Sequence, residues 1–78
     1  MSKVESSLMK KIKENPNSVF KVIVVQNDDS AQNKLEKGGL TRIMDQMHSG
    51  SLSGKEIIKL GKLKSVKGVE EDKEMKAL

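Results

Sequence analysis

Val19-Phe-Lys-Val-Ile-Val-Val-Gln26 is the stretch that decides the fold, because it is the strongest strand signal in the chain. It is rich in β-branched residues and is bounded by Asn and Pro before it and by Asn and Asp after it. We expect it to form a central strand. Side chains alternate along a strand, which gives two sets: Phe20, Val22 and Val24, and Lys21, Ile23 and Val25. Both sets are partly apolar, and the sequence leaves open which of them faces the helices.

Local signals downstream of this strand predict a helix and two strands. Ser30 can cap a short helix over residues 31–37, and Gly38 can take the left-handed conformation that ends it. Residues 40–47 alternate weakly and predict a second strand. Ser49-Gly50-Ser51 breaks that pattern, so a third strand has to fall within residues 48–52.

The next helix has a specific start signal. Ser53 and Glu56 have the spacing of a capping box, so we expect this helix to begin at Gly54 and to end near residues 61–64. Its lysines recur at helical spacing on a predicted solvent side. The last strand is predicted over residues 66–71.

The predicted element order is β-α-β-β-α-β, which is the ferredoxin-like arrangement of the α+β class. It places two helices on one face of a four-stranded antiparallel sheet. In front of it, Val4, Leu8 and Ile12 recur every four residues and predict a short, loosely docked helical extension. We therefore expect an extension over residues 1–17, a domain over 18–72 and an extended tail over 73–78. This topology hosts many functions and indicates none by itself.

Composition limits the size and the chemistry of the domain. The chain has 78 residues, one aromatic side chain and no Cys, so a small aliphatic core is expected without disulfides or thiolate metal sites. We expect low stability alone, with a binding partner adding to it. No run reaches the ~18 apolar residues that a membrane span requires, and the first fourteen residues lack the apolar region of a signal peptide.

Catalytic and metal sites find little support in the sequence. Asp45, His48 and Ser49 are the residue types of a hydrolytic triad, but positions 45 and 48 on a strand would face opposite sides. His48 is expected to be a surface residue of a hairpin. The three consecutive carboxylates at positions 70–72 alternate across a strand and do not form a metal cage. We expect no enzyme activity, no metal and no cofactor.

Nucleic-acid binding is the main alternative, because the isoelectric point is about 9.4. A single-strand reader of this topology stacks bases on aromatic residues of its sheet. This chain has no Tyr, no Trp and only Phe20, so we expect no nucleic-acid partner.

Several segments together resemble the subtilisin propeptide family, which includes small stand-alone proteinase inhibitors of the same fold. They are the strand segment Val19–Val25, the pair Gly38-Gly39, the segment from Leu52-Ser53 through the following helix to Leu60, and the most specific one, Val66-Lys-Gly-Val-Glu-Glu-Asp72. Residues before Asn15 have no counterpart in the resemblance.

The resemblance implies a prodomain of a subtilisin-like serine protease, which acts as an intramolecular chaperone and then as a tight inhibitor in a 1:1 complex. It implies that the open sheet face packs on two helices of the enzyme and that Glu70 and Asp72 cap the N-termini of those helices. The tail would lie product-like in the active-site cleft. The tail residues concerned are Met75, Lys76, Ala77 and Leu78, with Leu78 in the primary specificity pocket.

The resemblance leaves open whether the chain is a prodomain or a stand-alone inhibitor. A prodomain would be found outside the cell or in the cell envelope with its protease, whereas a stand-alone inhibitor would be cytoplasmic. The start at Met1 without a signal fits the second role, and the apolar Leu78 fits the first.

Overall fold

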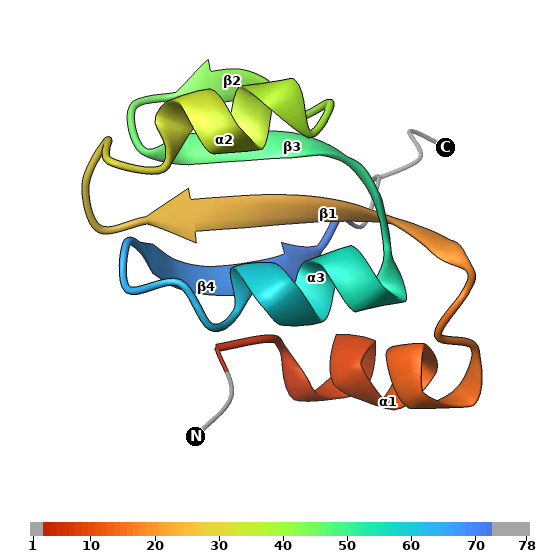
Figure 1. Ribbon diagram of the computed structural model, residues 1–78. Helices are drawn as coiled ribbons and strands as arrows, with labels where there is room; N and C mark the ends of the chain where they lie inside the picture. Colours follow the sequence, from red (N-terminus) through yellow and green to blue (C-terminus); the bar gives the residue numbers. More distant parts are fainter. Residues whose placement is uncertain (1–2, 73–78) are drawn as a thin grey trace, which may run out of the picture.

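The computed structural model describes residues 3–72. In chain order the elements are α1 (Ser6–Glu14), β1 (Val19–Gln26), α2 (Gln32–Lys37), β2 (Thr41–Met44), β3 (Met47–Ser53), α3 (Gly54–Leu60) and β4 (Val66–Glu71). The four strands form one antiparallel sheet in the order β2-β3-β1-β4. Helices α2 and α3 lie side by side over one face of this sheet, while α1 flanks them on the β4 side (Figure 1).

The predicted α+β fold of ferredoxin-like type is confirmed. β3 lies between β1 and β2, which is the split βαβ arrangement, and β4 adds to the other side of β1. The predicted central strand and last strand have the expected bounds.

The alternation along β1 shows which face of the sheet carries the core. Val22 and Val24 are fully buried, while Ile23 and Val25 are half-buried on the opposite face. The question that the sequence left open is therefore decided: the helices cover the face of Val22 and Val24. The buried apolar residues that form the core are Val4, Leu8, Ile12, Val22, Val24, Ala31, Leu35, Leu40, Leu52, Ile57, Val66 and Val69.

The N-terminal segment belongs to this core, so the prediction of a loosely docked extension is wrong. Leu8 and Ile12 are at most 1% exposed. The segment also pairs with the edge strand β4: the Glu5 N–H donates to the Val69 carbonyl at 2.9 Å, and the Val69 N–H donates to the Lys3 carbonyl at 3.0 Å. The four-residue apolar repeat was read correctly as a helix, but its narrow apolar stripe is enough to join the core because α3 offers small residues to it.

Those small residues are the glycines at the two ends of α3. A Cβ atom added at Gly54 would lie 2.8 Å from Ile12 Cγ2 and 2.9 Å from the Pro16 carbonyl oxygen. At Gly61 it would lie 3.1 Å from Val4 Cγ2. Helix α1 and the segment before it thus approach α3 more closely than a side chain there would allow.

Of the two predicted helix N-caps, that of α3 is confirmed and that of α2 is wrong. The capping box of α3 is confirmed, because the Ser53 side chain accepts from the Glu56 N–H while the Glu56 side chain accepts from the Ser53 N–H. The Ser30 cap of α2 is wrong: Ala31 is the N-cap residue, and the Ser30 hydroxyl donates instead to Asp28 Oδ1 at 2.5 Å. A local turn around Asp28 satisfies Ser30 before the helix begins.

The end of α2 and the hairpin after it also differ from the prediction. Gly38 has a helical φ of −76°, and Gly39, with a φ of 98°, takes the left-handed conformation. The second strand stops at Met44 because Asp45 and Gln46 form the turn, with Gln46 at a φ of 63°. Met47 therefore begins β3 instead of ending β2.

Candidate functional site

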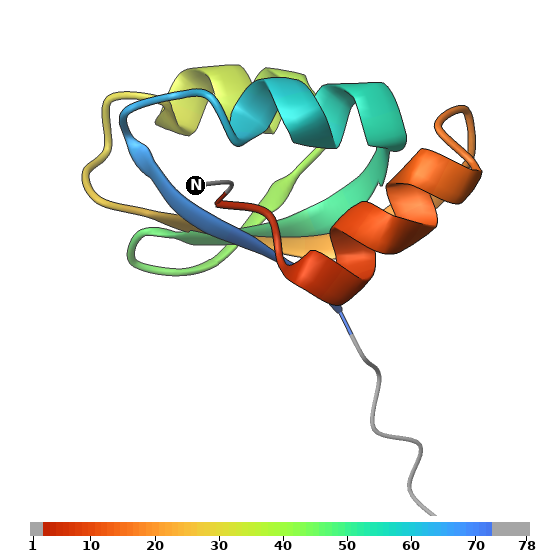
Figure 2. The ribbon, with the colours of Figure 1, turned by 90° about the horizontal axis from the view of Figure 1, so that it is seen from below.

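The uncovered face of the sheet is the first candidate for a functional surface. No described helix lies over it (Figure 2). Ile23 is half-buried there, opposite Ser49 on β3 and Glu70 on β4. Val25, also half-buried, is opposite Met47 and Gly68. Ser49 and Gly68 are small and Met47 is apolar, so Ile23 and Val25 form a shallow apolar strip, which we call the open face.

The outer strand β2 extends this apolar character. Met44 is opposite Met47 and is 59% exposed, and its neighbour Ile43 is 49% exposed. Sequence reasoning assigned both to a weak strand and did not identify them as surface residues. Their position beside the polar turn at Asp45 and Gln46 was the signal that could have indicated exposure.

The three consecutive carboxylates separate onto two faces. Glu70 is exposed on the open face, opposite Ile23. Asp72 continues the pairing two residues further on, because its N–H donates to the Lys21 carbonyl at 2.9 Å, so alternation places it on the side of Glu70. The structure thus brings together the two residues that the sequence analysis selected.

Glu71 lies on the helix face instead. It is opposite Val22, and both its carboxylate oxygens accept from Lys11 Nζ at 2.8 Å. This ion pair connects α1 to the end of β4. The carboxylate of Glu71 is therefore occupied by an ion pair within the domain. Glu70 has no hydrogen-bond or ion-pair partner among the side chains of residues 3–72.

The predicted cleft-binding residues, Met75, Lys76, Ala77 and Leu78, lie outside the described residues. The described chain reaches Asp72, the residue that follows β4 on the sheet. Glu70 and Asp72, which border the open face, come shortly before Met75 in the sequence.

The residues of the hydrolytic-triad pattern do not meet. Asp45 is in the hairpin turn and forms an ion pair with Arg42, while Ser49 is on the open face, opposite Ile23. His48 is 1% exposed, so its predicted surface position is wrong. It is opposite Val24, on the face that the helices cover.

His48 has a further property that the sequence did not indicate. Neither of its ring nitrogens has a hydrogen-bond partner among the described residues. Gln26, two positions after Val24 on the same face of β1, is also buried and leaves its Oε1 atom unpaired within the described part.

The open face also bears on the nucleic-acid alternative. Phe20 is the one aromatic residue of the sequence, and it is opposite Leu52 on the helix face, packed against the core. It does not present a stacking surface on the open face.

Electrostatic effects within the domain are local. The Ser30 hydroxyl and the Ser30 N–H both donate to Asp28, and these two bonds lower the pKa of that exposed carboxyl below its ordinary value of 3.8.

Within residues 3–72, no group of three or more His, Cys, Asp or Glu side chains is arranged to hold a metal ion. No helix in the same range has the length and apolar character needed to cross a membrane.

The open face, bordered by Glu70 and Asp72, is therefore our candidate functional site in the described structure. Comparisons of this chain with protein-family models, with curated proteins and with solved structures found no match.

Proposed function

We propose that this chain is an inhibitory domain of a subtilisin-like serine protease, a prodomain that assists folding of the enzyme and then inhibits it. The observation that carries the proposal is the open face. A small domain exposes an apolar strip there, with two carboxylates at one end of it, directly before the predicted tail. Such a surface fits packing against helices whose N-termini meet those carboxylates.

The electrostatic part of this proposal rests on the partial positive charge at the N-terminus of a helix. The first turn of a helix leaves backbone N–H groups unpaired and carries a partial positive charge. Glu70 and Asp72 are free of the Lys11 ion pair that occupies Glu71, so they supply charge for two such helix ends. Exposed apolar strips bordered by polar groups commonly serve as protein interfaces.

In this proposal the segment from Met75 to Leu78 enters the protease cleft as an added strand. Backbone hydrogen bonds give affinity in this binding mode, and alternate side chains fill pockets. Met75 and Leu78 supply the apolar anchors, with Lys76 and Ala77 between them.

A stand-alone inhibitor is the second candidate, and one observation favours it. Helix α1 contributes Leu8 and Ile12 to the core, and the resemblance assigns that helix no counterpart. This additional buried surface supports a domain that folds before it meets an enzyme.

Inhibition of a subtilisin tests the role of the tail. The full chain is expected to inhibit hydrolysis of a peptide substrate in the nanomolar range, and a chain ending at Glu74 is expected to inhibit at least about a hundredfold more weakly because four contact residues are lost. Equal inhibition by the two chains would exclude the tail from the cleft. Absence of inhibition by the full chain would refute the proposed function.

A paired substitution tests the open face separately. Glu70→Ala with Asp72→Ala should weaken inhibition about tenfold, since each carboxylate at a helix N-terminus contributes roughly 0.3–1 kcal/mol and up to ~2 kcal/mol when partly buried. The matched control is Asp29→Ala with Glu36→Ala, which removes two exposed carboxylates away from this face. Equal loss in both double variants would show that net charge, and not the open face, governs binding. Circular dichroism of each free variant establishes that the fold is retained.

A further inference from the structure

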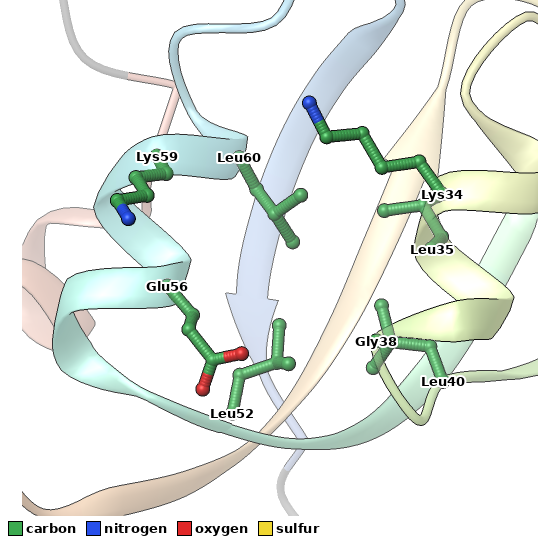
Figure 3. A pocket seen from close by; sticks show the side chains of 8 residues that line it. All are labelled: Lys34, Leu35, Gly38, Leu40, Leu52, Glu56, Lys59 and Leu60. Carbon is green, nitrogen blue, oxygen red and sulfur yellow. The ribbon is translucent and has the colours of Figure 1, made fainter.

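A hollow between α2 and α3 lies on the helix side of the sheet, away from the open face. Its volume is about 260 Å³. It is lined by Lys34, Leu35, Gly38, Leu40, Leu52, Glu56, Lys59 and Leu60 (Figure 3). The hollow is open to solvent on one side, and its walls come from α2, the segment after it, the end of β3 and α3.

Leucine side chains dominate the interior of this hollow. Leu35, Leu40 and Leu52 are each at most 4% exposed, and Leu60 is half-buried. In Figure 3 all four side chains point into the space between the two helices. Ligand sites share this character, with apolar walls and a few polar groups that fix orientation.

The charged side chains at the rim differ in whether they already form hydrogen bonds and in where they point. Glu56 belongs to the capping box, where its Oε1 atom accepts from the Ser53 N–H at 3.2 Å and from the Ser53 hydroxyl at 2.9 Å. Lys34 extends from α2 toward α3, and no described residue forms an ion pair with it. Lys59 points away from the hollow, on the outer side of α3 (Figure 3). Lys34 is thus the available charge at the mouth.

The charge at one end of the hollow favours an anion. The charged residues that line it are Lys34, Glu56 and Lys59, of which Glu56 is the capping residue and Lys59 points away. Glu56 lies next to Leu52, at the opposite end of the hollow from Lys34 (Figure 3). A bound carboxylate would therefore lie at the Lys34 end, with its hydrocarbon part directed toward Leu52.

We propose that this hollow binds a medium-chain fatty-acid anion, with the acyl chain against the four leucines and the carboxylate at Lys34. The volume is just below the ~300 Å³ at which pockets for drug-sized ligands begin, which favours a chain of medium length over a long one. This activity is independent of protease inhibition, since the hollow and the open face are on opposite sides of the sheet.

Titration of the methyl-labelled full chain with sodium octanoate tests this proposal by NMR. We expect saturable shifts of the methyl signals of Leu35, Leu40, Leu52 and Leu60, with those of Ile23 and Val25 unmoved. Octylammonium has a similar chain and the opposite charge, so it should bind at least about fivefold more weakly. Absence of saturation, or shifts centred on the open face, would overturn the proposal, and equal binding of the two amphiphiles would refute selection by Lys34.

Two variants test the role of the Lys34 charge and the role of the apolar hollow separately. Lys34→Gln should lower octanoate affinity about two- to fivefold, the range expected for an ion pair at an exposed rim, while the control Lys62→Gln, an exposed lysine that does not line the hollow, should leave it unchanged. Leu60→Phe fills part of the hollow and should abolish the leucine shifts. Equal affinity of the Lys34 and Lys62 variants, or full binding by the Leu60 variant, contradicts the assigned site.

Discussion

Replacing Gly54 with Ala is the sharpest test of the way α1 joins the domain. The new methyl group would lie 2.8 Å from Ile12 Cγ2 and 2.9 Å from the Pro16 carbonyl oxygen. The second of these atoms is backbone, in the connection from α1 to β1. Gly54 is itself tied to that connection, because its N–H donates to the Ser18 carbonyl at 3.2 Å. The clash with Pro16 can be relieved only by moving backbone, either that of the connection after α1 or that of the start of α3.

The magnitude follows from two opposing effects. Inserting a methyl group into a packed contact costs about 1–3 kcal/mol. Ala restricts the unfolded chain more than Gly does, and this returns about 0.4–1 kcal/mol where the folded backbone allows it. We expect a net loss in the free energy of unfolding of about 0.5–2 kcal/mol. A domain of this size has roughly 0.05–0.15 kcal/mol of stability per residue, so the loss is large enough to measure.

Urea unfolding of the full chain followed by circular dichroism measures this loss. The control is Gly38→Ala, at a helical φ of −76°, where the added methyl group would meet its nearest atoms at 3.4 and 3.5 Å. We expect this variant to be as stable as the original chain or slightly more stable. A Gly54→Ala variant with an unchanged or raised urea midpoint would show that α1 does not pack on α3 in the way described.

Three further predictions concern the polar groups of the domain. His48→Leu should raise the melting temperature, because a buried polar group without partners costs about 1–3 kcal/mol that an apolar side chain does not; a fall in the melting temperature would indicate that the ring is satisfied. Ser30→Ala should raise the pKa of Asp28 toward 3.8 in an NMR titration of the carboxyl group. Because the folded pKa lies below the unfolded one, the stability that Ser30 provides is present above pH 3.8 and is lost as the pH falls through the folded pKa, and a stability difference that persists at lower pH would contradict this. Lys11→Ala should cost at most about 1 kcal/mol in urea unfolding, since the Lys11 side chain of the ion pair is half exposed, and a loss comparable to that of a core residue would refute this assignment.

The parts of the fold that sequence reasoning predicted correctly have strong local causes. The β-branched run of β1 and the reciprocal capping box of Ser53 and Glu56 carry their structure within a few residues. The alternation of Glu70, Glu71 and Asp72 likewise fixed which two carboxylates share a face, once β4 was recognised. These signals needed no knowledge of tertiary packing.

The parts that it missed depend on partners far along the chain. The burial of α1 and of the segment before it depends on Gly54 and Gly61, which lie at least forty positions downstream of the helix and looked like ordinary helix-end glycines. His48 looked like a surface residue because it lies in a predicted hairpin, and only the register with Val24 places it beneath the helices. The hollow between α2 and α3 is a property of how two helices sit on a sheet, which no local pattern encodes.

The pairing of Lys3 and Glu5 with Val69 has a consequence for self-association. A sheet can grow by strand addition only at an unpaired edge, and continuous fibres require two such edges on every molecule. In this domain the N-terminal segment occupies the middle of the β4 edge, which leaves β2 as the remaining side of the described sheet. Association through β2 would therefore stop at pairs of molecules, and polymerisation would first require the N-terminal segment to detach.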